Sequence, residues 1–391
     1  MSTILRPSSR IESVDALRGF AVLAILLVHN LEHFIFPVYP DDPSWLAVID
    51  KGVFSAVFAL FAGKAYAIFA LLFGFTFYIQ SHNQRVKGKD FGYRFLWRIL
   101  LLAGFATLNA AFFPAGDVLL LFVCISLVLF VARNWSDTAI LAASVFFLLQ
   151  PVEWTHCIYG AIHPSHTLPD LNVGAMYAEV ADYTREGNFW KFIAGNITLG
   201  QKASLLWAVN AGRFFQTAGL FLAGLYLGRR GLFVQSPANN RRWIRILIVS
   251  AVAFAPLYAL HDLIMADGSP LTRQTAGTAF DMWQKLAFTF VLTSSFILLY
   301  NSERFARLTA SLRSYGRMSL TNYISQSIIG AFVYFPFGLF LARYCGYTLS
   351  LLVGIATFIL QIRFSRWWLS RHRQGPLETL WHKWTWIGTR T

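Results

Sequence analysis

Long apolar segments follow one another along most of this 391-residue chain. A helix that crosses a lipid bilayer needs about 20 consecutive apolar residues. By that measure the sequence predicts ten membrane spans, at about 14–36, 55–79, 95–113, 116–132, 137–153, 204–228, 243–264, 281–300, 319–341 and 347–369. Charged residues make up only 13% of the chain, against about 25% in a typical soluble domain. The sequence therefore predicts an all-α, polytopic membrane bundle and excludes a soluble enzyme.

The distribution of basic residues predicts how these spans are oriented. Of the 33 Lys and Arg residues, 24 fall at the termini or in the loops on the N-terminal side. Cytoplasmic loops of membrane proteins are enriched in Lys and Arg. We therefore expect both termini to be cytoplasmic and the net charge of +14 to reflect topology rather than nucleic-acid binding. Three scattered cysteines predict neither a disulfide framework nor a cysteine metal site.

Two regions are expected along the chain. Residues 1–300 would form an N-terminal transmembrane bundle with an extracytoplasmic loop at 154–202, and residues 301–391 would form two more spans and an interfacial tail rich in Trp and Arg. Within the long loop, residues Val173–Glu186 predict one amphipathic helix. Loops of this length are usually functional.

Ionisable residues inside the apolar runs are the main candidates for function, because a charge at bilayer depth is costly and usually lines a cavity. They are Arg18, His29, Glu32, His33, Lys64, Asp117, Arg213, His261, Asp262 and Lys285. Arg18 and His29 are eleven residues apart, so at about 100° per residue they point in nearly the same direction, about 16 Å apart along the helix axis. The first span thus presents a cation near the cytoplasm and an imidazole deep in the membrane.

Three interpretations of His29 remain open at this point. It is a neutral core histidine, or part of the H-x-x-E-H pattern that His29 to His33 spell, which marks some zinc proteases, or a general base, a role that suits an imidazole near neutral pH. No distal third ligand is evident, so no metal is predicted. Lys64, Arg213 and Lys285 can also extend to the interface as ordinary snorkelling side chains.

Several segments resemble, in order, the YeiB family, whose defining region is called domain of unknown function 418. They are RIESVDALRGFAVLAILLVHN, GKAYAIFALLFGFTF, the segment from Phe95 to Leu121 ending in GDVLL, GRMSLTNYISQS, and FSRWWL followed by GPLETLW. YeiB proteins resemble, more distantly, the transmembrane acyltransferase superfamily, which includes the acyltransferase-3 proteins and the heparan glucosaminide acetyltransferases. Arg18, Gly19 and His29 fit the acyltransferase-3 spacing, whereas His29 and Asn109 stand where YeiB relatives commonly carry Asn and His.

The resemblance implies a multi-pass acyltransferase of the bacterial inner (plasma) membrane. It would move an acyl group, expected to be acetyl, from cytoplasmic acyl-CoA to a hydroxyl or amine of an extracytoplasmic glycan or small molecule. His29 would be the base, oriented by Glu32 or Asp117. The co-substrate is acyl-CoA (acetyl-CoA) without a metal, and the lipid bilayer and a homodimeric copy are further expected partners. The CoA phosphates would bind to Arg18, Arg94 and Arg98. The acceptor would bind to His33, Lys64 and Arg213.

Two other functions fit the same residues. In a transporter of a small anionic solute, Lys64, Arg213 and Lys285 would bind the solute, although transporters tend to contain internal repeats and none is evident here. In a non-catalytic scaffold, the buried polar residues would only hold helices together.

Overall fold

The structure is a computed structural model that describes residues 11–40, 44–114 and 116–388. Within these ranges every regular element is a helix, so the all-α prediction is confirmed. The helices are α1 (Glu12–Glu32), α2 (Ser44–Phe61), α3 (Lys64–Val86), α4 (Gly92–Phe112), α5 (Leu119–Ile125), α6 (Leu127–Ala132), α7 (Asp137–Leu148), α8 (Pro151–Ile162), α9 (Val173–Glu186), α10 (Phe189–Gly195), η1 (Asn196–Gly200), α11 (Gln201–Asn210), α12 (Arg213–Arg229), α13 (Pro237–Asp267), α14 (Pro270–Thr272), η2 (Arg273–Gly277), α15 (Thr278–Leu299), α16 (Glu303–Leu308), α17 (Ala310–Arg317), α18 (Ser319–Tyr334), η3 (Leu341–Arg343), α19 (Tyr347–Leu369) and α20 (Pro376–Thr385).

Six helical segments of the described chain are long and apolar enough to cross a membrane, or seven if α7 and α8, which meet at 48°, form one crossing. The expectation of a membrane protein therefore holds, but the predicted count of ten spans is not confirmed. The predicted spans at 14–36, 95–113, 243–264, 281–300 and 347–369 correspond to α1, α4, α13, α15 and α19. The cytoplasmic position of the termini stays a prediction.

The remaining predicted spans are broken or short. The run at 55–79 lies within the candidate crossing Trp45–Val86, in which α2 is followed by α3, and the run at 204–228 joins α11 to α12. Each break contains a glycine in the left-handed region, Gly63 (φ 76°) and Gly212 (φ 64°), a conformation that an α-helix cannot continue through. The run at 116–132 is divided into the short helices α5 and α6, and α18 has only 16 residues.

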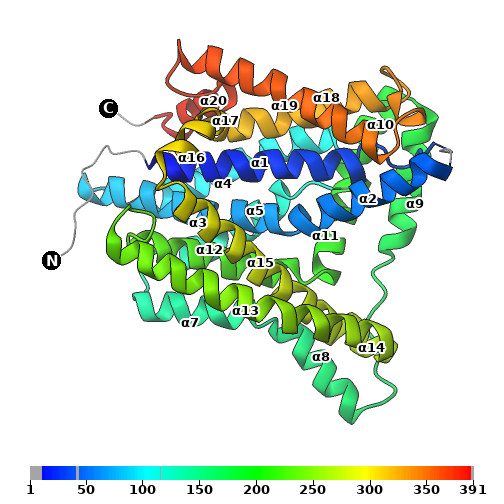
Figure 1. Ribbon diagram of the computed structural model, residues 1–391, viewed down its shortest axis with the longest axis horizontal. Coiled ribbons are helices and arrows are strands. Elements are labelled where there is room, and N and C mark those ends of the chain that lie inside the picture. Colours follow the sequence, from blue (N-terminus) through cyan, green and yellow to red (C-terminus); the bar gives the residue numbers. More distant parts are fainter. Residues whose placement is uncertain (1–10, 41–43, 115, 389–391) are drawn as a thin grey trace.

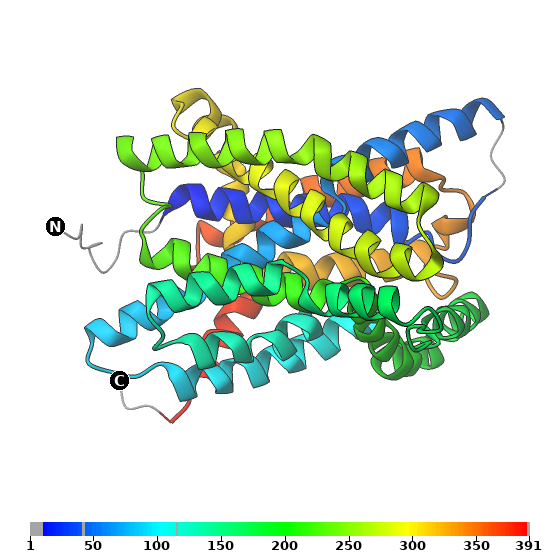
Figure 2. The same cartoon turned by 90° about the horizontal axis from the view of Figure 1, so that it is seen from below.

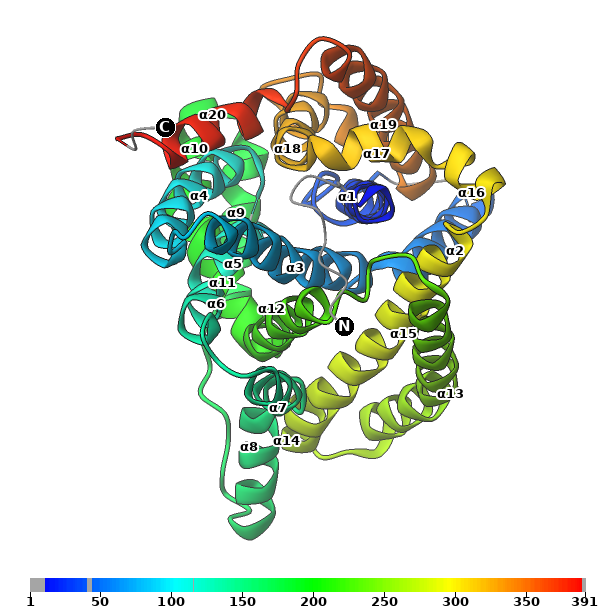
Figure 3. The same cartoon turned by 90° about the vertical axis from the view of Figure 1, so that its left-hand side faces the viewer.

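Helix α1 is at the centre of the upper half of the bundle. Figure 3 shows it enclosed by α17, α18 and α19 on one side and α3 on the other. In Figure 1, α1 begins at the end of the molecule where α20 lies and ends near α9. Because α17 and α19 pack directly on α1, residues on both sides of the expected 300/301 boundary share this core, and the division into two regions stays a prediction.

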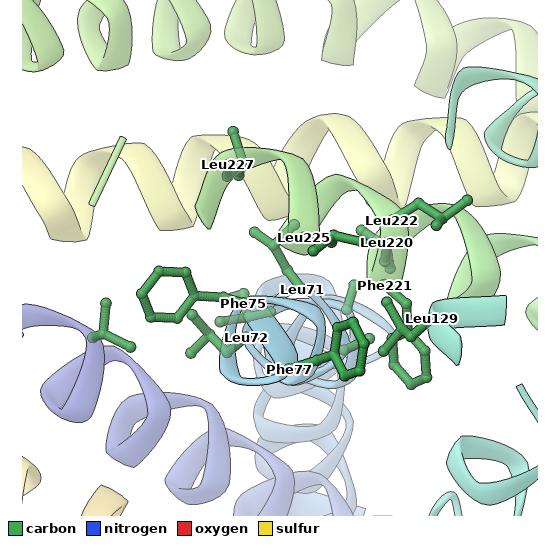
Figure 4. Packing of buried hydrophobic residues seen from close by; sticks show 14 of the residues in the cluster. Leu71, Leu72, Phe75, Phe77, Leu129, Leu220, Phe221, Leu222, Leu225 and Leu227 are labelled. Atoms are coloured by element: carbon green, nitrogen blue, oxygen red, sulfur yellow. The ribbon is translucent and has the colours of Figure 1, made fainter. Parts of the chain in front are cut away.

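The largest hydrophobic cluster lies between α3 and α12. Figure 4 shows Leu71 and Phe75 of α3 against Phe221 and Leu225 of α12. Outside this layer, α13 pairs with α15 along one side of the bundle, which Figure 2 shows from below. The polar positions considered next lie between α1, α3 and α12.

The predicted extracytoplasmic segment is also helical. Helix α9 spans Val173–Glu186, the range expected from the sequence. It buries Val180 and Tyr183 in a cluster with Phe192 and Phe335, and it exposes Glu179 and Asp182. This amphipathic helix covers the end of the bundle at which α1 terminates (Figure 1).

The C-terminal helix α20 crosses the start of α18 and the side of α4 (Figure 3). Its Glu378 carboxylate accepts hydrogen bonds from Leu320 N (2.8 Å), Thr321 N (3.1 Å) and Thr321 Oγ1 (2.6 Å). The two N–H groups are backbone donors that the first turn of α18 cannot satisfy internally. Burial raises the pKa of Glu378 in spite of these bonds.

Replacing Glu378 with alanine should release α20 from the bundle. The substitution leaves two α18 amides without their acceptor, which costs about 1–3 kcal/mol. Limited proteolysis should cut Glu378→Ala after α19 faster than the unmodified protein, whereas Glu303→Ala, an exposed glutamate in α16, should behave as the unmodified protein does. Equal resistance of the two variants would show that Glu378 does not hold α20.

Candidate functional site

An outer cavity of about 410 Å³ lies where α1 ends. Its wall comes from the last turns of α1, the break between α2 and α3, the start of α12, and Tyr177 of α9. Four of the nine predicted site residues line it, namely His29, Glu32, His33 and Arg213. The exposed side chains of Glu32, Tyr39 and Trp207 are also in the wall, so the cavity reaches the surface.

His29 is the deepest titratable residue of this cavity. Its side chain is only 8% exposed, and its ring packs against Phe113 (centroids 4.4 Å apart), His33 (5.5 Å) and Tyr323 (6.0 Å). Among the described residues, no side chain or carbonyl hydrogen-bonds its ring nitrogens. The ring is therefore held by packing while its nitrogens are free to meet a ligand.

Neither carboxylate expected to orient His29 bonds to it in the described part of the chain. Glu32 Oε2 lies 3.5 Å from Nε2 of His33 instead. The reason is geometric: His33 follows Glu32 directly and turns toward the same rim of the cavity. The roles of His29, Glu32 and His33 therefore stay predictions. In the described ranges, no group of three His, Cys, Asp or Glu side chains is placed to hold a metal ion.

Asp117 lies behind the cavity wall. Its Oδ1 accepts a hydrogen bond from Leu119 N at 2.9 Å and so caps the start of α5. Asn109 and Tyr323 face the same carboxylate, but Asp117 Oδ2, Asn109 Nδ2 and Tyr323 Oη complete no hydrogen bond of ordinary geometry. Tyr323 was not among the predicted site residues. A tyrosine directly after GRMSLTN was the only signal for it.

Three cations surround the outer cavity, but their contacts differ. Arg213 stacks between Tyr66 (4.6 Å from the ring centroid) and Trp207 (4.9 Å). Lys285 Nζ pairs with Asp281 Oδ2 at 2.5 Å. Lys64 is just outside the wall, and its Nζ donates to Ala59 O at 2.9 Å.

An inner cavity of about 250 Å³ lies near the beginning of α1. Arg18 and Arg98 line it together with His382 of α20, and aromatic and aliphatic residues form most of the remaining wall. Arg18 Nη2 donates to Thr76 Oγ1 at 3.0 Å, and Arg98 lies 3.5 Å from the ring centroid of Trp381. Burial, and then the charge of Arg98, lowers the pKa of His382.

Arg94 does not line this cavity. Its Nη1 donates to Thr385 O at 2.9 Å and to Ile387 O at 3.3 Å, so it holds the end of α20. The sequence grouped Arg94 with Arg98, but only Arg98 is in the cavity wall.

A thin apolar layer separates the two cavities. They share no lining residue, and Ile25, Ala65, Leu119 and Tyr323 pack together between them. Arg18 and His29 therefore look into separate cavities rather than one continuous passage. Tyr323 is the link, because it lines the inner cavity while its ring centroid is 6.0 Å from that of His29.

Comparison with known proteins matches part of the chain to a family. The sequence profile described as "Protein of unknown function (DUF418)" matches residues 227–388, and uncharacterized protein YxaH of Bacillus subtilis is 25% identical over 97% of this chain and 95% of its own length. Residues 227–388 therefore carry the DUF418 region. Uncharacterized protein YeiB of Escherichia coli is 26% identical over 95% of each chain, and a 39.9 kDa protein of Bacillus acidopullulyticus is 28% identical over 96% of this chain. No solved structure matches the chain.

The DUF418 match covers the chain from the end of α12 through α20. It therefore includes Tyr323 of the layer between the cavities and the Glu378 anchor of α20. Arg18, His29 and Arg213 lie outside the matched range, on helices that the DUF418 region encloses or adjoins.

Proposed function

We propose that this protein is an acyltransferase that takes an acyl group from acyl-CoA in the inner cavity and passes it to an acceptor in the outer cavity. The observation that supports this function best is the pair of cavities at opposite ends of α1 with only Tyr323 and a few apolar side chains between them. A large charged carrier can then stay on one side while a small acyl group crosses. The bacterial inner membrane and a glycan or small-molecule acceptor are part of the same proposal.

The inner cavity suits the carrier chemically. Arg18 and Arg98 provide guanidinium groups, which bind phosphates through paired hydrogen bonds. The apolar remainder of the wall, with Phe69, Phe73 and Leu102, suits an acyl chain and the arm that carries it. Arg94 would contribute only by holding α20 in place.

The outer cavity provides the base. His29 removes the proton from the acceptor hydroxyl, and the freed oxygen attacks the thioester carbon. The carbon–sulfur bond then breaks, and His29 returns the proton to the departing sulfur, so that the imidazole is regenerated. Tyr323 lies where the thioester must approach His29, so its ring has to move aside or bind the acyl group there.

Binding of CoA at Arg18 tests the carrier half of the proposal. CoA and acetyl-CoA should raise the melting temperature of the detergent-solubilised protein, and Arg18→Gln should weaken CoA binding by about tenfold, because it removes a charged hydrogen-bond donor. Arg229→Gln is the matched control. Arg229 is also a partly buried arginine at this end of the bundle, but it bonds to Trp135 O and Arg133 O and does not line the cavity. Equal CoA binding by the two variants would remove Arg18 from the carrier site.

Transport of an anionic solute is the second candidate. The breaks at Gly63 and Gly212 favour it, because discontinuous helices commonly form the substrate sites of transporters. Uptake of labelled anion into proteoliposomes, without any effect of CoA on the melting temperature, would replace the acyltransferase with this function.

A further inference from the structure

We infer that the outer cavity is an anion-binding site, formed by Arg213 and the first turns of α3 and α12, and that the acceptor therefore carries a phosphate or carboxylate close to its reacting hydroxyl. The statement about the acceptor rests on the proposed function. The anion site itself rests only on the residues described below.

The first observation is that two broken helices begin at this cavity. Helix α3 begins at Lys64 directly after Gly63, and α12 begins at Arg213 directly after Gly212. Glycine has no side chain with which to cap a helix, and neither start has a side-chain cap. The first-turn N–H groups of a helix attract anions, through both hydrogen bonding and the helix dipole.

The two helix starts are held next to one another. Tyr66, in the first turn of α3, donates from Oη to Arg213 O at 3.4 Å and also hydrogen-bonds Thr217 of α12. Gly63, Tyr66 and Arg213 all line the outer cavity. The positive ends of two helices therefore lie at one site.

The second observation concerns Arg213 itself. Its Nε is buried and has no hydrogen-bond partner, and no carboxylate of the described chain forms an ion pair with it. The nearby carboxylates face other groups, since Asp281 pairs with Lys285 and Glu32 Oε2 lies 3.5 Å from Nε2 of His33. A buried hydrogen-bond donor without a partner is costly, and a bound anion would supply that partner.

The third observation places the anion beside the proposed base. His29 is more than nine-tenths buried, its ring nitrogens hydrogen-bond none of the described residues, and it lines the same cavity as Arg213. The planar guanidinium can grip two oxygens of a phosphate or carboxylate. An acceptor fixed in this way would present a nearby hydroxyl to the imidazole.

Phosphate binding tests the site directly. Sodium phosphate and glycerol 3-phosphate, titrated into the purified protein in the absence of CoA, should quench tryptophan fluorescence, because Trp207 stacks on Arg213. Arg213→Gln should weaken binding by about tenfold or more. Arg213→Lys keeps the charge but not the planar guanidinium group. Its affinity for phosphate should lie between those of the unmodified protein and Arg213→Gln. This variant also tests the site if Arg213→Gln does not fold.

Arg343→Gln is the matched control. Arg343 also stacks on an aromatic ring, that of Tyr344 at 4.5 Å, but it is exposed and outside the cavity wall. It should bind phosphate as the unmodified protein does. Absence of phosphate binding, or equal loss in the Arg213 and Arg343 variants, overturns the inference.

Two further measurements identify the source of the anion and separate this inference from the proposed function. Nanodiscs of phosphatidylglycerol, compared with phosphatidylcholine, should compete with phosphate if the acceptor is a lipid headgroup. If they do not compete, the same Arg213-dependent binding supports a soluble anion. If phosphate binds at Arg213 but CoA does not bind, the proposed acyltransferase function fails and the anion site stands. If CoA binds but phosphate does not, the anion site fails and the proposed acyltransferase function stands.

Discussion

Replacing His29 with alanine is expected to reduce acyl transfer by about 10²- to 10⁴-fold, the usual contribution of a positioned general base. The bundle should remain folded. The ring of His29 packs against Phe113 but hydrogen-bonds no described residue, so its removal enlarges an existing cavity and leaves no buried polar group unpaired. Transfer of label from acetyl-CoA into membrane or exported material, measured at matched protein levels, checks this prediction.

A second histidine on a membrane helix provides the control. His261 of α13 lies outside both cavity walls and contacts Asp262, so His261→Ala should retain full transfer. His29→Gln preserves much of the volume without a base and should be as inactive as His29→Ala. Full transfer by folded His29→Ala would show that another group removes the proton.

The sequence predicted the helical class because apolar run length alone determines it. It could not predict the breaks at Gly63 and Gly212, since a glycine within an apolar run has the same hydropathy whether the helix continues or ends there. Only the packing of Tyr66 against Arg213 and Thr217 reveals that two helices start at that place. The difference between ten predicted runs and the six or seven candidate crossings comes from the break at Gly212, the bend between α7 and α8, the short helices α5 and α6, and the 16-residue α18.

The sequence predicted only those features of the candidate site that depend on a single helix. Helical periodicity relates Arg18 to His29 because both residues lie on the single helix α1. Contacts between helices are not encoded in that way. Hence only the structure shows that Glu32 pairs with His33, that Asp117 lies behind the cavity wall, and that Arg94 holds the end of α20. Tyr323, which joins the two cavities, was missed because it belongs to a helix about 290 residues further along the chain.

The largest effect on folding is expected from Gly74→Ala. A Cβ at Gly74 of α3 would lie 1.9 Å from Phe221 O, and one at Gly224 of α12 would lie 1.9 Å from Leu71 O. Both obstacles are backbone atoms of helices already packed together, as Figure 4 shows for their neighbours, so neither can turn aside as a side chain would. Close approach at small residues is a main source of helix association in membranes.

Separating α3 from α12 should cost at least about 3 kcal/mol, the upper part of the range for overpacked cores. It should also disturb the outer cavity, because both helices begin there. Gly74→Ala and Gly224→Ala should each give little monodisperse protein in size-exclusion chromatography and a lower melting temperature. Gly104→Ala is the control, since a Cβ at this glycine in the middle of α4 meets no atom within 4 Å. Because alanine favours a helix by about 1 kcal/mol over glycine, Gly104→Ala should be neutral or stabilising. If all three variants were equally stable, the contact between α3 and α12 could not be as close as described.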